Sequence, residues 1–112
     1  MNISNKEDAV LLLLNQLDSR HERVIRIYFG LGNEKKKSIE DIGNDFELNV
    51  GEVIELKNNA IREFIRLILS TGMFGDKGGN FTDEFIQASQ SEFLDNFMRK
   101  FIDYTEKSFG LP

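Results

Sequence analysis

Apolar residues recur at helical spacing along most of the chain, and short polar or glycine-rich stretches separate the periodic segments. The first segment, residues 5–16, has an apolar stripe formed by Val10, Leu13, Leu14 and Leu17. Leu11 and Leu12 lie outside most of this stripe, and a helix that is apolar around most of its girth is usually covered on two sides. We therefore expect a central helix of a small bundle, with a docking ridge for another protein at Leu11 and Leu12 as the alternative.

A second helix is predicted over residues 19–29, directly after the good N-cap residue Asp18. Its apolar side is formed by Val24, Ile25, Ile27 and Tyr28. Arg20, Arg23 and Arg26 recur every three residues and form a basic stripe. The glycines of residues 30–32 end this helix, and three lysines follow in a charged loop: Lys35, Lys36 and Lys37. Our first interpretation of both basic features is a solvated surface.

Residues 38–64 have the pattern of a helix, a tight turn and a longer helix. Ser38 is the expected first N-cap, and the apolar face of the first helix consists of Ile39, Ile42 and Phe46. Gly43 leaves room for a second backbone, residues 47–48 form the corner, and Asn49 is the next N-cap. Helical spacing then continues through Val53, Leu56, Ala60, Ile61 and Phe64. This combination of period and turn length is typical of a helix-turn-helix.

The stretch resembles region 4 of bacterial σ70-type factors, the helix-turn-helix domain that reads promoter DNA. The matching residues are Ser38-Ile39-Glu40-Asp41-Ile42-Gly43, Phe46, Leu48, Asn49, Val53, Leu56, Ala60, Ile61, Arg62 and Phe64. Residues 17–25 and 28–32 resemble two upstream motifs of the family, so the similarity covers about residues 7–66. The resemblance implies a bacterial or phage protein with a role in transcription. In the family this domain also docks on the β-subunit flap of RNA polymerase and is a target of anti-σ factors and activators.

The start of the second helix departs from the family pattern. The family has arginines and a glutamine there, whereas this chain has Val50, Gly51, Glu52, Val53, Ile54 and Glu55. Arginine and glutamine make bidentate contacts to base edges, and carboxylates repel the phosphate backbone. Val50 and Ile54 form an apolar pair on the face that meets DNA in the family. The fold is therefore expected to carry over, and the reading of DNA is not.

The C-terminal part lies outside the resemblance. We divide the chain into a region 4-like domain (residues 1–71), a glycine-rich linker (72–80) and a C-terminal amphipathic helix (81–112). That helix has two adjacent apolar rows, with polar residues such as Asp95 opposite them; the rows are formed by Phe93, Phe97, Phe101, Leu94, Met98 and Ile102. We expect it to cover the face of Val50 and Ile54, to lie beside the first helix, or to exchange between two chains as a homodimer.

Composition excludes several classes of function. The chain has 112 residues, a formal net charge of −5, no cysteine and one histidine. A lone histidine predicts neither a metal site nor a catalytic centre, and no phosphate-binding loop is present, so we expect no metal, no cofactor and no enzyme activity. No apolar run is long enough to span a bilayer, and no signal peptide is recognisable. We expect a cytoplasmic, all-α protein without a membrane segment.

Three functions remain as hypotheses. The first is a transcription regulator that binds RNA polymerase, a sigma factor or an anti-sigma factor, with little or no DNA binding. Its predicted site consists of Val50, Ile54, Glu52, Glu55, Leu11 and Leu12. The second is a DNA-binding regulator or small sigma-like factor, with backbone contacts from Arg20, Arg23, Arg26, Lys35, Lys36 and Lys37. The third is a homo-oligomeric scaffold.

Overall fold

The structure is a computed structural model that describes the backbone of residues 6–109 and the side chains of residues 10–75 and 78–105. The described part of the chain has six α-helices, one 3₁₀ helix and no strand. The helices are α1 (Lys6–Leu14), α2 (Ser19–Phe29), α3 (Ile39–Phe46), α4 (Val50–Ser70), η1 (Gly75–Asn80), α5 (Asp83–Ala88) and α6 (Ser91–Phe109). The predicted all-α small bundle is confirmed. The division into a domain, a linker and a C-terminal segment stays a prediction.

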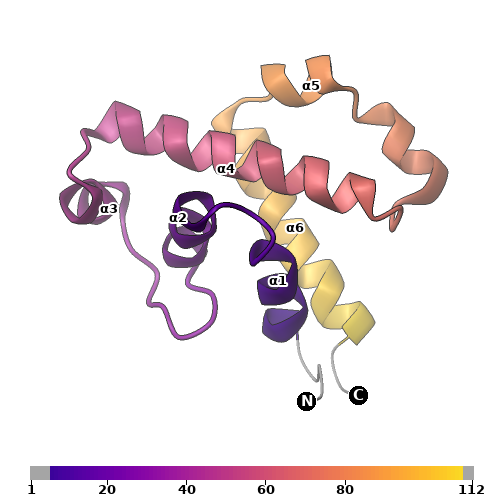
Figure 1. Cartoon of the computed structure of the whole chain (residues 1–112), viewed down its shortest axis with the longest axis horizontal. Helices are drawn as coiled ribbons and strands as arrows, with labels where there is room; N and C mark the ends of the chain where they lie inside the picture. The colour runs from indigo at the N-terminus through magenta and orange to yellow at the C-terminus, as the bar shows by residue number, and fades with distance from the viewer. Residues whose placement is uncertain (1–5, 110–112) are drawn as a thin grey trace.

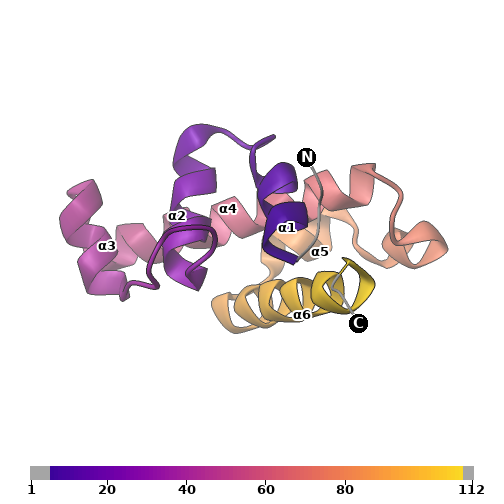
Figure 2. The ribbon, with the colours of Figure 1, turned by 90° about the horizontal axis from the view of Figure 1, so that it is seen from below.

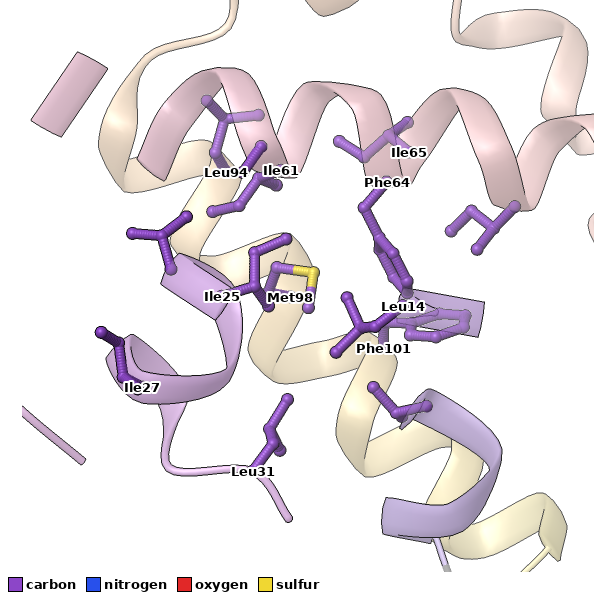
Figure 3. Packing of buried hydrophobic residues seen from close by; sticks show 14 of the residues in the cluster. Leu14, Ile25, Ile27, Leu31, Ile61, Phe64, Ile65, Leu94, Met98 and Phe101 are labelled. Carbon is purple, nitrogen blue, oxygen red and sulfur yellow. The ribbon is translucent and has the colours of Figure 1, made fainter. Parts of the chain in front are cut away.

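The long helix α4 contacts each of the other five α-helices (Figure 1). α3 lies at its beginning, α2 lies between α3 and α1, and α6 runs beside α1 (Figure 2). Buried side chains from four helices meet in the core, among them Leu14 of α1, Ile25 of α2, Phe64 of α4 and Met98 of α6 (Figure 3). The rings of Phe64 and Phe101 pack edge to face with their centroids 5.4 Å apart. The core therefore includes residues from both sides of the glycine-rich stretch.

Helix starts follow the capping residues of the sequence. The Asp18 carboxylate accepts a hydrogen bond from the His21 backbone N–H at 2.9 Å, and the Ser38 hydroxyl accepts one from Asp41 N–H at 3.1 Å. These two predicted caps are confirmed, and so are the bounds of the helix at residues 19–29. The first helix ends at Leu14, two residues before its predicted end.

The expectation of a single helix in the C-terminal part is wrong. Residues 75–80 of the glycine-rich stretch form a 3₁₀ helix, and the expected single last helix is two helices broken at residues 89–90. Ser89 has extended backbone angles (φ −66°, ψ 138°), and its carbonyl accepts a 2.7 Å hydrogen bond from the Arg62 guanidinium. Arg62 also donates to the carbonyl of Ile86 at 3.2 Å. Arg62 of α4 therefore stabilises the break. Its guanidinium donates to carbonyl oxygens that would accept backbone N–H groups in a continuous helix.

A buried polar network fixes α6 against α2 and α4. The Lys57 ammonium is 2% exposed and lies 2.7 Å from the Asp95 carboxylate, to which the Tyr28 hydroxyl also donates at 2.7 Å. The same ammonium lies 5.2 Å from the centroid of the Tyr28 ring. Burial and the hydrogen bond to Asp95 raise the pKa of Tyr28 to about 12. Asp95 was expected on the solvated side of the last helix; that expectation is wrong because Asp95 is the partner of a buried cation.

The position of α6 distinguishes the first two packing alternatives, and exchange between two chains stays a prediction. α6 lies beside α1 and against α4, and the Val50 side chain remains 48% exposed. The last helix therefore leaves Val50 uncovered, contrary to the first alternative, and lies beside the first helix, as in the second. Among the helices that the structure describes, none is long and apolar enough to cross a membrane.

Candidate partner-binding surface

Carboxylates cluster at one end of the molecule. We call this end, residues 39–56, the acidic lobe; it consists of α3, the turn of residues 47–49 and the first turns of α4. The lobe contains no lysine, arginine or histidine and six exposed acidic residues, Glu40, Asp41, Asp45, Glu47, Glu52 and Glu55. The whole chain has 19 acidic residues and 14 lysines and arginines. The 94 residues outside the lobe contain 13 of the acidic residues and all 14 of the lysines and arginines, so their charges nearly cancel. The net negative charge of the protein is therefore concentrated in this lobe.

The turn between α3 and α4 is fixed by close backbone packing. A Cβ on Gly43 would lie 2.6 Å from the Leu48 carbonyl oxygen, so a side chain at this position would collide with the turn. Glu47 ends α3 with left-handed backbone angles (φ 58°, ψ 47°), and its N–H bonds to the Gly43 carbonyl. The close approach that the sequence predicted for Gly43 is confirmed, and it sets the direction in which α4 leaves the turn.

A capping box holds the start of α4. The Asn49 side chain accepts a hydrogen bond from Glu52 N–H at 2.8 Å, and the Glu52 carboxylate accepts one from Asn49 N–H at 3.0 Å. The N-cap predicted at Asn49 is thus confirmed. Glu52 has a structural role in this reciprocal pair besides its contribution to the charge of the surface, so substitutions of Glu52 are poor probes of binding alone.

Apolar atoms lie beside the carboxylates of the acidic lobe. Val50 is 48% exposed and Ile54 is half-buried. A depression of about 410 Å³ lies on a different face of α4, and it is lined by Arg20, Leu48, Glu52, Glu55, Leu56 and Asn59. In this depression Leu48 and Leu56 lie beside Glu52 and Glu55, which suits a protein partner with cationic side chains around an apolar group.

The basic residues of the alternative site are engaged in different ways. The guanidinium carbons of Arg20 and Arg23 lie 5.9 and 6.0 Å from the centroid of the Phe46 ring, so both arginines sit where α2 meets α3. Arg26 lies 3.7 Å from Glu22 on its own helix. Of the three lysines, Lys37 lies 2.6 Å from Asp45, whereas Lys35 and Lys36 are exposed.

The structure separates the residues of the predicted protein-binding site into two places. Val50, Glu52, Ile54 and Glu55 lie together at the start of α4. Leu11 and Leu12 lie on α1, and α2 separates α1 from α3 (Figure 1). Leu11 is half-buried and packs near Gly32, whereas Leu12 is 48% exposed. One partner patch therefore centres on α3 and α4, and α1 is not adjacent to it.

Our sequence interpretation missed four of the six carboxylates of the acidic lobe. It compared charges only from residue 49 onward and left out the acidic residues of α3 and the turn, Glu40, Asp41, Asp45 and Glu47. A charge count over residues 39–56 would have found them, because this stretch contains no cation. The placement of all six on one lobe required the fold.

Comparison with known proteins finds similarity to a sigma factor. The chain is 28% identical over 57 residues to "RNA polymerase sigma factor SigA" of Clostridium acetobutylicum. The match covers 51% of this chain and 15% of the length of that sigma factor. No family model matches, and no solved structure matches. About half of the chain is therefore similar to a small part of a sigma factor.

Proposed function

We propose that this protein is a transcription-related regulator that binds a protein of the transcription machinery, such as RNA polymerase, a sigma factor or an anti-sigma factor, through its acidic lobe. The observation that carries the proposal is the set of six exposed carboxylates without a cation over residues 39–56. The distant similarity to a sigma factor gives the context of transcription. The protein acts in this proposal by binding and not by catalysis.

Electrostatics argue against DNA as the ligand of this lobe. In a helix-turn-helix the second helix enters the major groove between two rows of phosphates. At the start of α4, Glu52 and Glu55 are exposed, and the cationic side chain that shares their depression is Arg20 of α2. Each carboxylate brought near the phosphates adds repulsion, and none supplies the counterion release that drives non-specific binding. DNA reading by this face is therefore weak or lost in the proposal.

The chemistry of the lobe also restricts the protein partner. A matching surface has lysines or arginines opposite the carboxylates and an apolar side chain opposite Val50 and Ile54. Nucleic-acid-binding proteins have cationic surfaces of this kind where they contact phosphates. We therefore expect the partner to be engaged on a basic surface, and the association rate to fall as the salt concentration rises.

A second candidate function is a DNA-binding regulator or small sigma-like factor. The observation in its favour is that Arg20, Arg23, Lys35 and Lys36 are exposed on α2 and the following loop, outside the acidic lobe. Side chains at such positions can bind phosphates without reading bases. This alternative predicts binding that is independent of DNA sequence and has a steep dependence on salt.

The test combines capture of the partner with DNA titration. Tagged protein is incubated with purified bacterial RNA polymerase core enzyme, a primary sigma factor and an anti-sigma factor, without DNA, at low and high salt. We expect salt-sensitive capture of one of them by the wild type and loss of capture by the double variant Glu40→Lys/Glu55→Lys. Glu84→Lys on α5 is the control, because Glu84 is exposed and lies outside the acidic lobe.

DNA titration with the same proteins decides between the two candidates. A mobility-shift series with a −35-like promoter duplex and a scrambled duplex is expected to show no selective binding by the wild type. Tight, sequence-selective capture of the promoter duplex by the purified chain would contradict the proposal. Sequence-independent binding that Arg20→Glu/Lys36→Glu abolishes, with no protein partner captured, would support the second candidate.

A further inference from the structure

A groove lined by aromatic side chains lies between α6 and the segment before α5. Its volume is about 420 Å³, and its aromatic lining consists of Phe74, Phe81, Phe93, Phe97, Phe101 and Tyr104. The rings form a continuous ladder: successive centroids from Phe93 to Phe97, Phe97 to Phe101 and Phe101 to Tyr104 are each 6.4 Å apart. Phe93 is 38% exposed and Tyr104 is 49% exposed at the two ends of the ladder, whereas Phe97 is half-buried and Phe101 is buried.

A row of polar residues runs beside this ladder. Glu92, Asn96 and Lys100 are exposed and follow one another at intervals of four residues, each one position before Phe93, Phe97 and Phe101 respectively. Residues four apart are neighbours on one face of a helix, so the polar row is parallel to the aromatic one. Asn96 and Lys100 also line the groove. Within the described part of the chain, neither Glu92 nor Lys100 forms an ion pair.

The polar row is complementary to itself when it is reversed. It has an anion at one end, an amide in the middle and a cation at the other end. In a two-fold interface, residue i of one chain contacts residue j of the other, and j contacts i. We place the two-fold axis at Asn96, with the two copies of α6 antiparallel. Glu92 of each copy then faces Lys100 of the other copy, and the two Asn96 amides face each other as donor and acceptor.

We infer that the occupant of the aromatic groove is a second copy of this chain, paired through α6 with antiparallel helices and a two-fold axis at Asn96. The exposed parts of the ladder, chiefly Phe93 and Tyr104, supply the apolar area, and the polar row sets the direction and register of the pair. This interface lies on α6, whereas the surface of the proposed function lies on α3 and α4, so the two are tested independently. A homodimer also presents two acidic lobes to a partner.

The experiment uses charge reversal in the full chain, followed by sedimentation velocity and light scattering over a range of protein concentrations. The wild type is expected to form a dimer whose population rises with concentration. Lys100→Glu places two carboxylates opposite each other at both ends of the interface and is expected to weaken dimerisation roughly tenfold or more. Glu92→Lys is expected to weaken it similarly, because it places two ammonium groups opposite each other.

Mixing the two single variants is the decisive measurement. Lys100→Glu has carboxylates at both ends of its row and Glu92→Lys has ammonium groups at both ends, so only the mixed pair is complementary. We expect each variant to be mostly monomeric alone and the mixture to form a heterodimer at least as well as the wild type does. The double variant Glu92→Lys/Lys100→Glu is expected to regain homodimer formation.

Two controls separate pairing from folding. Lys35→Glu makes the same charge change in the loop before α3 and is expected to leave dimerisation unchanged, and circular dichroism shows whether each variant remains helical. Phe93→Ser removes an exposed ring of the ladder and is expected to give a folded monomer. A wild type that stays monomeric at every concentration, or a mixture that associates no better than its two components, would overturn the inference.

Discussion

The start of α4 and the second half of the same helix are held in different ways. At the start, contacts join residues close in sequence: Asn49 with Glu52, and Gly43 with Leu48. Further along the helix, Lys57 and Phe64 contact residues of α6 that are 38 and 37 positions away along the chain. The first region leaves its polar side chains to solvent, whereas the second buries most of its apolar side chains in the core.

This difference shows how one helix can serve two purposes. Local caps fix the backbone of the acidic lobe without covering its surface, so Glu55 and Val50 remain available to a partner. The rest of α4 provides the stability, because it packs against helices from both ends of the chain. Substitutions on the exposed face of the lobe are therefore expected to change binding more than folding.

Breaking the buried ion pair is expected to have the largest effect. Asp95→Ala leaves the Lys57 ammonium, 2% exposed, without its carboxylate, and removes the acceptor of the Tyr28 hydroxyl. Loss of one partner of a buried pair costs about 3–5 kcal/mol, so we expect the free energy of unfolding in urea to fall by that amount. Lys57→Met/Asp95→Leu removes both charges and should retain more stability than the single variant does. A single variant as stable as the wild type would show that long-range polar contacts do not hold α6.

The next largest effect is expected within the acidic lobe. In Gly43→Ala the new Cβ would lie 2.6 Å from the Leu48 carbonyl oxygen, so the turn must shift. We expect a loss of about 1–3 kcal/mol in thermal or urea unfolding, together with weaker capture of the protein partner. Gly51→Ala is the matched control: its Cβ would have its nearest neighbour at 3.4 Å, and it is expected to retain or slightly raise stability. Equal stability of the two variants would contradict the importance of the close approach at Gly43.

Removal of a cap should have a smaller effect than the distortion of the turn. Asn49→Ala loses the side-chain acceptor for the Glu52 N–H and with it one half of the capping box. The expected loss is about 1 kcal/mol in urea unfolding. Asn49→Asp keeps an acceptor at the same position and should remain close to the wild type. If alanine and aspartate gave the same stability, the cap would not be what fixes the start of α4.

The smallest effect concerns the pH dependence of the buried network. The pKa of Tyr28 rises from 10.0 to about 12 in the folded protein, because burial disfavours the phenolate and the Asp95 carboxylate accepts a hydrogen bond from the neutral hydroxyl. The folded pKa lies above the unfolded one, so the contribution of Tyr28 to stability is complete below pH 10 and is lost as the pH approaches 12. Urea titrations should therefore show that the difference between the wild type and Tyr28→Phe shrinks over this interval. Tyr104→Phe, at an exposed position, serves as the control and should show a smaller change.

Most helix starts could be predicted from the sequence because they depend on neighbours. Asp18, Ser38 and Asn49 each accept from a backbone N–H three residues later, which is a relation within one turn. The buried role of Lys57 had a partial signal, since Lys57 falls between Val53 and Ile61 in an apolar row spaced by four residues. Nothing local indicated that Asp95 would be its partner.

The sequence by itself determined the helical class, the caps, the tight turn at Gly43 and the concentration of acidic residues before and within α4, because each of these is a property of adjacent residues. Only the tertiary structure decided where the last helix lies, why it breaks at Ser89, and that Leu11 and Leu12 are remote from Val50. Those features depend on contacts between segments 24 or more residues apart, such as Arg62 with Ile86. The apolar pattern favours burial of a face without specifying which other face covers it, and that choice is made by complementary shape and by the few buried polar pairs.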